Sequence, residues 1–343
     1  MGIIGFLNMV LLAISPRLRN NRQEIMTLDE TKIINGFFVF FIFLGHSTQY
    51  IVLNNSIFTR VYLMFDRQIG QLCVATFLFF SGYGVMESIK KKKNYISKMP
   101  RNRLIPTYST FILSLILFYL VNVLFSIKYD LRTYIYSIFA IESIGNSNWY
   151  IFTIMWMYII TYILGRFCRN NYKIIAYVQL GISVLFIVIL KFLFAFPSRF
   201  YSTVLCYSIG LIYSIYKDSI NKWLIEKKII SLVSILFLIG IVILSGMRAN
   251  EFGYNLYAVL FVILMVWCMN FLTFKSRTLL FMGKHCFSIY LLQRIPMIIF
   301  SEIFGDNVNE MLFIVASFVC VVLIAIPFEK LTSVITSKIK DNG

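Results

Sequence analysis

Ten runs of 17 to 23 mostly apolar residues follow one another along the chain, with short connections between them. A helix needs about 20 such residues to cross the hydrocarbon core of a bilayer. Only 14% of the 343 residues are charged, and the mean hydropathy is +0.80, so the chain lacks the charged shell of a soluble domain. The sequence therefore predicts an all-α, multi-pass membrane protein with about ten transmembrane helices. The runs are residues 33–53, 70–89, 106–127, 149–165, 174–196, 200–216, 229–245, 255–274, 286–303 and 311–328.

The basic residues between these runs indicate how the chain is oriented. Counted from the N-terminus, the odd-numbered connecting segments hold 24 of the 32 Lys and Arg residues, and the even-numbered segments hold six. Positive residues concentrate on the cytoplasmic side, so both termini are predicted to lie in the cytoplasm, in a protein of the cell membrane. The net charge of +17 then reflects topology and contacts with membrane lipid or an anionic cofactor, and no nucleic-acid-binding motif accompanies it.

Three parts of the chain can be distinguished. Residues 1–29 form a predicted N-terminal interfacial or cytoplasmic segment, residues 30–330 the transmembrane domain, and residues 331–343 a cytoplasmic tail. Residues 131–148 are semi-apolar and end in SIGNSNW, which predicts an outside loop, either without a helix or with a half-helix that dips into the membrane. No Cys-x-x-Cys or zinc-ligand spacing occurs among the six cysteines, so neither a metal site nor a disulfide framework is predicted.

The first apolar run carries one of the two histidines of the chain well inside it. An ionisable group within a span costs free energy unless it is paired or hydrated, so it is a candidate functional residue. His46 lies 13 residues into the run, and Asn35, Gln49 and Tyr50 are predicted to share its helix face. These residues predict a polar stripe that rises from the cytoplasmic end, with His46 as the catalytic residue. The alternative is a histidine that only hydrogen-bonds a neighbouring helix.

Two further runs have polar interruptions. Arg294 lies in the ninth run, where its permanent charge needs a carboxylate, a phosphate, carbonyl groups or water, unless the side chain snorkels to an interface. Pro296 follows and is expected to loosen the helix and free a carbonyl group. In the second run, the sequence SGYG around Tyr83 predicts either close helix packing through small residues or a tyrosine beside a cavity.

Residues 90–106, KKKKNYISKMPRNRLIP, form the most basic connecting segment. The lysine run is interpreted as a topology signal that also contacts anionic lipid. Arg101 and Arg103 stand at the start of the third span, where two guanidinium groups are suited to binding phosphate.

Taken in order, several stretches of the chain resemble the acyltransferase 3 family. Its members are integral membrane acyltransferases with about ten spans, and many of them O-acetylate cell-surface polysaccharides. The resemblance covers about residues 30–330, and the order and spacing of the motifs are more specific than any one of them. The stretches are NGFFVFFIFLGH, FFSGYGVMES, RNRLIPTY, NWYIFTIMWMYIITYI and GKHCFSIYLLQRIP.

The chain departs from the family pattern at three positions. Asn35 stands where the family has a basic residue eleven positions before the histidine, and Lys32 is the cation one turn below it. Pro100 replaces the first arginine of the family's Arg-x-x-Arg pair, whereas Arg103 matches the second. Gln293 stands where many members have histidine.

The resemblance implies that acetyl-CoA, or another acyl-CoA, is a co-substrate supplied from the cytoplasm, and that no cofactor is bound permanently. Donor contacts are then expected from Lys32, Asn35, Arg101 and Arg103. The acceptor is expected to be a hydroxyl group of an extracellular or lipid-linked glycan.

In this interpretation His46 acts as the general base or carries the acyl group itself. Tyr83 or Arg294 is expected to stabilise the oxyanion that forms during transfer. Trp149, at the outer end of the fourth span, is expected to contact the acceptor sugar, unless it belongs to an interfacial aromatic belt.

Two other functions fit the same residues. A transporter or flippase for a glycan or a small anion would also place a polar stripe inside a helical bundle. The arginines at positions 101 and 103 favour a phosphate-bearing donor over this alternative. Asn35 and Gln293 leave open an acceptor-binding subunit that has lost catalysis.

Overall fold

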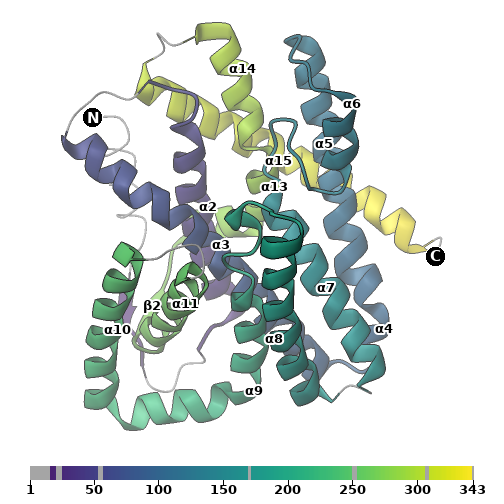
Figure 1. Cartoon of the computed structure of the whole chain (residues 1–343). Coiled ribbons are helices and arrows are strands. Elements are labelled where there is room, and N and C mark those ends of the chain that lie inside the picture. Colours follow the sequence, from purple (N-terminus) through teal and green to yellow (C-terminus); the bar gives the residue numbers. More distant parts are fainter. Residues whose placement is uncertain are drawn as a thin grey trace.

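The computed structural model describes residues 16–20, 25–52, 57–168, 171–248, 253–305 and 309–341. Helices make up nearly all of this part of the chain, as the apolar runs predict, and they pack side by side around a common apolar core (Figure 1). The predicted interfacial residues 1–15 lie outside the described residues.

The elements follow one another with short connections. The first half contains β1 (Pro16–Leu18), α2 (Leu28–Ser47), α3 (Ile57–Lys91), α4 (Tyr95–Met99), the π-helix η1 (Pro100–Leu104), α5 (Ile105–Leu124), α6 (Leu131–Ile138), α7 (Trp149–Phe167), α8 (Tyr172–Val188) and η2 (Ile189–Leu193). The second half contains η3 (Ser198–Phe200), α9 (Leu205–Glu226), α10 (Lys228–Arg248), α11 (Gly253–Phe271), β2 (Leu272–Phe274), α12 (Arg277–Lys284), α13 (Cys286–Leu292), α14 (Arg294–Phe304) and α15 (Glu310–Asp341).

Seven helical segments within the described residues are long and apolar enough to cross a membrane, which confirms a multi-pass membrane protein. An eighth arises if the bent pair Ser198–Glu226 and Ile229–Leu244 counts as one span. All ten predicted runs are helical over most of their length, but α2, the first of them, is outside the seven, because charged residues occupy its first turns. The number ten and the cytoplasmic termini stay predictions. The seven are Ile69–Lys91, Tyr95–Leu124, Trp149–Phe167, Tyr172–Leu193, Gly253–Phe271, Cys286–Phe304 and Glu310–Lys338.

Glycines allow two pairs of helices to approach closely. A Cβ atom at Gly82 of α3 would lie 2.0 Å from the carbonyl oxygen of Tyr207, and one at Gly210 of α9 would lie 2.2 Å from that of Phe79. The second pair is α2 with α12, where a Cβ atom at Gly283 would lie 1.7 Å from the carbonyl oxygen of Lys32. Backbone-to-backbone contact of this kind is the usual way in which small residues pack membrane helices.

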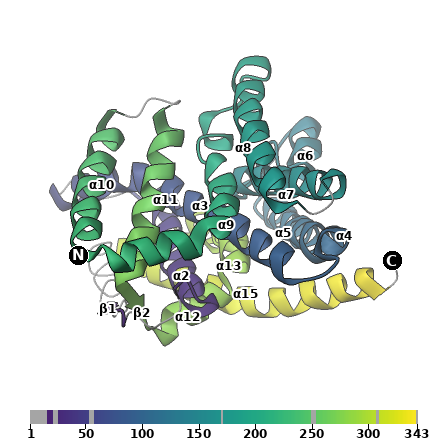
Figure 2. The same ribbon diagram turned by 90° about the horizontal axis from the view of Figure 1, so that it is seen from below.

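The start of α2 is fixed by local hydrogen bonds and by the N-terminal strand. Thr27 and Glu30 form a reciprocal capping box, which satisfies backbone donors that the first turn leaves free. The buried Glu30 carboxylate also pairs with Arg19 at 2.6 Å and accepts a hydrogen bond from Thr273 at 2.7 Å. Next to it, β1 pairs antiparallel with β2, and Arg17 lies opposite Thr273 (Figure 2). The described part of residues 1–29 is thus attached to the bundle.

The predicted outside loop 131–148 contains a helix in its first half and is buried in its second half. Its first half forms the short helix α6, which packs beside α5 (Figure 1). Its second half runs into the protein, where Ile144, Asn146, Ser147 and Asn148 are buried. The Asn122 side chain on α5 donates to the Ile144 carbonyl oxygen at 2.9 Å, and Gly145 adopts a positive φ of 105° that suits glycine. The second half of this connection between α5 and α7 therefore lies in the interior of the helical bundle. At the other terminus, the predicted tail continues α15 as far as Asp341.

Candidate active site

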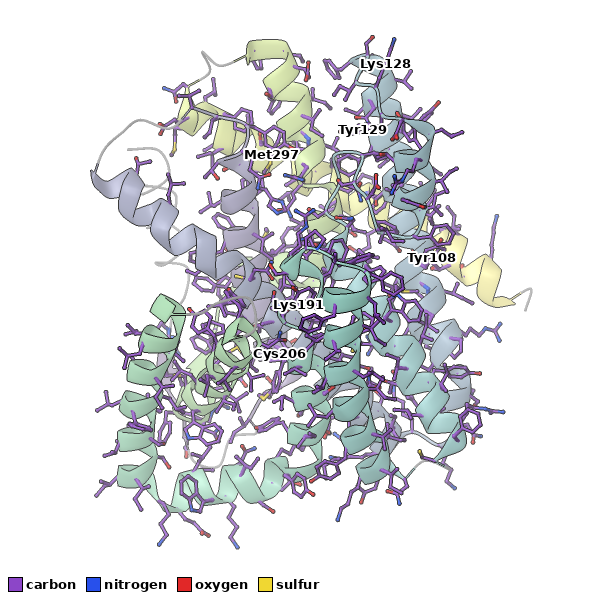
Figure 3. The ribbon with its side chains drawn as sticks, in the orientation of Figure 1. Tyr108, Lys128, Tyr129, Lys191, Cys206 and Met297 are labelled. Atoms are coloured by element: carbon purple, nitrogen blue, oxygen red, sulfur yellow. The ribbon has the colours of Figure 1, made fainter. Side chains whose placement is uncertain are left out.

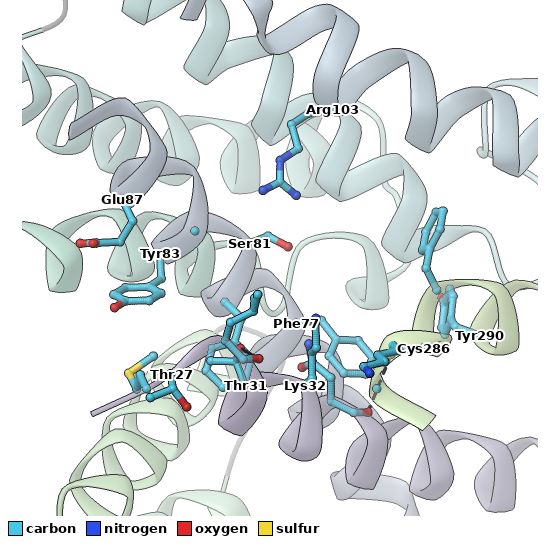
Figure 4. Close-up of a pocket in the computed structure, with 18 of the residues that line it drawn as sticks. Thr27, Thr31, Lys32, Phe77, Ser81, Tyr83, Glu87, Arg103, Cys286 and Tyr290 are labelled. Atoms are coloured by element: carbon cyan, nitrogen blue, oxygen red, sulfur yellow. Dashed lines mark hydrogen bonds between the residues drawn. The ribbon is translucent and has the colours of Figure 1, made fainter. Parts of the chain in front are cut away.

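A cavity of about 620 Å³ opens where α2 begins and where α3 and α12 end. Four of the residues that the sequence nominates line it: Lys32, Asn35, Tyr83 and Arg103 (Figure 4). They come from three segments that lie far apart in the sequence: α2, α3 and η1. The segments beside this opening are those predicted to face the cytoplasm.

The two nominated arginines are separated by the structure. Arg103 points into the cavity, and its Nε atom donates to the Tyr95 hydroxyl at 3.3 Å (Figure 4). Arg101 does not line the cavity and is exposed on the outside of η1. Residues two positions apart on a helix point in different directions, so the two guanidinium groups do not form one site.

Three lysines that were not singled out from the sequence also line the cavity. They are Lys91 at the end of α3, Lys217 on α9 and Lys284 at the end of α12. With Lys32 and Arg103 they bring five basic side chains to one cavity. They come from five separate elements, and no local motif in the sequence signals that they meet.

Among the described residues, Glu87 is the one acidic residue that lines this cavity, and it pairs with two of the basic side chains. Its carboxylate lies 3.0 Å from Lys91 and 3.0 Å from Lys217, and it also accepts a hydrogen bond from Ser214 at 2.7 Å. Lys217 reaches from Glu87 to Tyr83, whose hydroxyl lies 3.4 Å from the lysine Nζ atom. The net charge of the lining remains strongly positive, so the cavity suits an anionic ligand.

The SGYG stretch serves both of the purposes that the sequence left open. Gly82 packs against α9, whereas Ser81, Tyr83 and Gly84 line the cavity. A Cβ atom at Gly84 would meet nothing within 4 Å, so this glycine is not needed for packing.

The inner wall of the cavity is aromatic and contains a thiol. The Tyr150 ring lies edge-on between Phe77 and Tyr290, with ring centroids 6.2 Å and 5.5 Å away. Beside them, the Cys286 thiol donates to the Asn35 carbonyl oxygen at 3.7 Å. Asn35 keeps its side-chain oxygen buried with no hydrogen-bond partner among the described residues. This wall lies on the other side of the cavity from Tyr83 and Glu87 (Figure 4).

His46 lies beyond this wall, eleven residues or about 16 Å further along α2 than Asn35. Its Nδ1 atom is 3.5 Å from the hydroxyl of Ser147, which the buried loop after α6 provides. The stripe differs from prediction at its outer end, because α2 stops at Ser47 and leaves Gln49 and Tyr50 in the following turn. The hydroxyls of Ser47 and Thr48 bond back to the helix there.

Arg294 belongs to the same outer site as His46. Its guanidinium donates to the Gln49 side-chain oxygen and to the Gly145 carbonyl oxygen, the latter at 3.5 Å, and it lies 5.7 Å from the centre of the Tyr50 ring. Side-chain and carbonyl oxygens therefore bind its two terminal nitrogens, whereas its buried Nε atom has no hydrogen-bond partner among the described residues. Tyr83 and Arg294, both nominated for the oxyanion, thus lie at two different places.

The break that Pro296 was expected to cause is present. Helix α13 ends at Leu292 and α14 begins at Arg294, with Gln293 between them. Proline lacks a backbone N–H group, so it cannot continue the hydrogen-bond ladder. The Gln293 side chain donates to the Tyr290 carbonyl oxygen at 3.1 Å.

Trp149 occupies the first position of α7 and is half-buried against the apolar core. Its neighbour Tyr150, not Trp149 itself, lines the cavity. A sugar contact by Trp149 stays a prediction.

Comparison with known proteins decides the family. A family model described as an acyltransferase domain matches residues 32–330. The chain belongs to the acyltransferase 3 family. As a member, this acyltransferase is a multi-pass membrane protein, and the matched region contains both the basic cavity and the His46 site. No curated protein and no solved structure matched the chain.

Proposed function

We propose that this membrane acyltransferase transfers an acetyl group from cytoplasmic acetyl-CoA to a hydroxyl group of a cell-surface or lipid-linked polysaccharide. The observation that carries the proposal is the cavity, which gathers five basic side chains at its mouth and an aromatic wall further in, below His46. Acetyl-CoA is a long donor with phosphates at one end and an acyl thioester at the other. Its phosphates would bind at the basic mouth, and its thioester would reach the aromatic wall.

The basic mouth is suited to the phosphates of the donor. Arg103 presents a planar guanidinium that can bind two phosphate oxygens at once, and Lys32, Lys217 and Lys284 add point charges around it. The Glu87 ion pairs hold Lys217 and Lys91 in place before the donor arrives. Asn35 adds no charge, so the cation that the family pattern has at this position is supplied by its neighbours.

In this proposal His46 acts either as the general base that accepts the proton of the acceptor hydroxyl or as the nucleophile that carries the acyl group. When its Nδ1–H donates to the Ser147 hydroxyl oxygen, Nε2 keeps its lone pair and can accept the proton of the acceptor hydroxyl or attack the thioester itself. A positioned general base typically contributes about 10²–10⁴-fold to the rate. Both roles use the same nitrogen.

The acceptor would approach from the Arg294 side. Tyr50 lies next to Arg294, and Tyr129 interacts electrostatically with the same guanidinium from the connection between α5 and α6. The Tyr129 ring (Figure 3) also packs edge-on against Tyr134, with ring centroids 6.1 Å apart. Rings and a guanidinium group are suited to a sugar ring and its hydroxyl groups.

The first test is the chemical composition of the surface glycan. We expect a strain without this acyltransferase to lose O-acetyl groups from one glycan, and expression of the chain to restore them. Mass spectrometry of the purified glycan, before and after mild base treatment, measures the change. An unchanged acetyl content together with altered glycan export would favour a transporter instead.

The second test uses the separation of the two arginines. We expect Arg103→Ala to weaken coenzyme A binding by about tenfold or more, because a hydrogen bond to a charged group contributes about 1.5–3 kcal/mol. Arg101→Ala, which removes the same charge from the exposed side of η1, should have little effect. Isothermal titration of purified protein with coenzyme A measures both. Equal losses would indicate a diffuse basic field without a defined phosphate site.

A further inference from the structure

Tyr290 carries a buried hydroxyl group whose environment is unusual. The residue is 2% exposed and lies on α13, where its ring lines the donor cavity and packs edge-on against Tyr150. Its hydroxyl faces the Ser147 side chain but forms no hydrogen bond of normal geometry within the described residues. Buried polar groups nearly always have a partner, so an unpaired one that faces a cavity suggests that a ligand supplies the partner.

The position of this hydroxyl links the two halves of the site. Tyr290 lines the inner wall of the donor cavity together with Asn35 and Cys286 (Figure 4). On its other side it faces Ser147, the residue whose hydroxyl also contacts His46, and it interacts electrostatically with Arg294. The phenol therefore stands between the place proposed for the thioester and the imidazole proposed to act on it.

Tyr150 provides an internal comparison. It lines the same cavity and is similarly buried, at 8% exposure. Its hydroxyl, however, faces the Ser81 side chain on α3. Two neighbouring tyrosines thus share ring packing and burial, but only the Tyr290 hydroxyl faces Ser147, on the side of the His46 site.

We propose that the Tyr290 hydroxyl donates a hydrogen bond to the carbonyl oxygen of the donor thioester and is a catalytic residue of this acyltransferase. The inference rests on the function proposed above. Neither residue nominated from the sequence for this task is better placed. Tyr83 is next to Lys217 at the basic side of the cavity, and Arg294 is bonded to Gln49 and Gly145 at the outer site.

The chemistry balances with Tyr290 as a hydrogen-bond donor only. The oxygen of the acceptor hydroxyl attacks the thioester carbonyl carbon, and its proton moves to Nε2 of His46. The carbonyl oxygen becomes an oxyanion, which the Tyr290 O–H stabilises while remaining protonated. The oxyanion then collapses, the carbon–sulfur bond breaks, and the coenzyme A thiolate takes the proton from His46. If His46 attacks first, the same hydrogen bond serves both transfers.

The test compares Tyr290→Phe with Tyr150→Phe. Each change removes one hydroxyl and keeps the ring. Membranes from a strain that lacks the chromosomal copy and expresses each variant are supplied with radiolabelled acetyl-CoA, and base-labile acetate in the glycan fraction is counted. We expect Tyr290→Phe to lower kcat by about 10²–10³-fold, the usual cost of removing one oxyanion donor, with little change in the KM for acetyl-CoA. Tyr150→Phe should retain far more activity.

Two further measurements separate catalysis from structure. Coenzyme A should bind purified Tyr290→Phe protein as tightly as wild type, and the melting temperature should be equal or higher, because the change removes an unpaired buried hydroxyl. Activity of Tyr290→Phe equal to that of Tyr150→Phe, or a loss that appears only as weaker coenzyme A binding, would overturn the inference. Wild-type protein that neither binds coenzyme A nor transfers acetate would overturn the proposed function, and this inference with it.

Discussion

Replacement of His46 by glutamine is expected to reduce acyl transfer by about 100-fold or more, the lower end of what a positioned acid–base group supplies. Glutamine keeps hydrogen-bonding capacity and much of the volume, so it can still reach the Ser147 hydroxyl. It cannot accept a proton near neutral pH or carry an acyl group. Incorporation of radiolabelled acetate into the glycan fraction, at matched protein levels in the membrane, measures the effect.

The chain contains a matched control, because it has only one other histidine. His285 lies between α12 and α13, and its Nδ1 atom is 2.5 Å from the Glu329 carboxylate on α15. His285→Gln should keep most of the acyl-transfer activity, since this pair links the junction of α12 and α13 to α15, at the opposite end of α13 from Arg294.

The opposite result would be informative. If His46 only joined helices, His46→Gln should be nearly as active as wild type, because such hydrogen bonds contribute about 0.6–2 kcal/mol and glutamine can form one. Near-normal transfer by His46→Gln would end its catalytic assignment.

The sequence nominates those candidate site residues whose placement depends on one helix. A histidine within an apolar run is costly, and this alone nominates His46. The eleven-residue spacing from Asn35 follows from helix geometry, and Asn35 does line the cavity below His46. Arg101 and Arg103, by contrast, were nominated together as one phosphate site, and the structure separates them because residues two apart on a helix do not face each other.

Contacts between residues that lie far apart in the chain could not be predicted from the periodicity of one helix. Lys217 and Lys284 lie in separate connecting segments, and the charge pattern only predicts that they share a side of the membrane. Their convergence on one cavity follows from the packing of α3 against α9 and of α2 against α12. The position of Ser147 depends on a loop that turns inward, and Tyr290 is one aromatic residue within an apolar run, which by itself indicates only a core position.

The packing of α2 against α12 gives the second large effect that we expect. Gly283→Ala would place a Cβ atom 1.7 Å from the carbonyl oxygen of Lys32, and the contact is between backbones, so no side chain can move aside. The two helices must separate, and overpacking of this kind typically costs about 1–3 kcal/mol. We expect a lower melting temperature and weaker coenzyme A binding, because Lys32 and Lys284 both line the cavity at this contact.

Gly181→Ala is the matched control for this change. Gly181 is exposed in the middle of α8, and a Cβ atom there would meet nothing within 4 Å. Alanine favours a helix over glycine by about 1 kcal/mol, so Gly181→Ala should melt at the same or a higher temperature and bind coenzyme A normally. Thermal unfolding in detergent and coenzyme A titration measure both variants. If Gly283→Ala behaved like Gly181→Ala, the close contact between α2 and α12 would not be needed to hold the lysines around the cavity, and their arrangement would have to depend on the Glu87 ion pairs and the rest of the bundle.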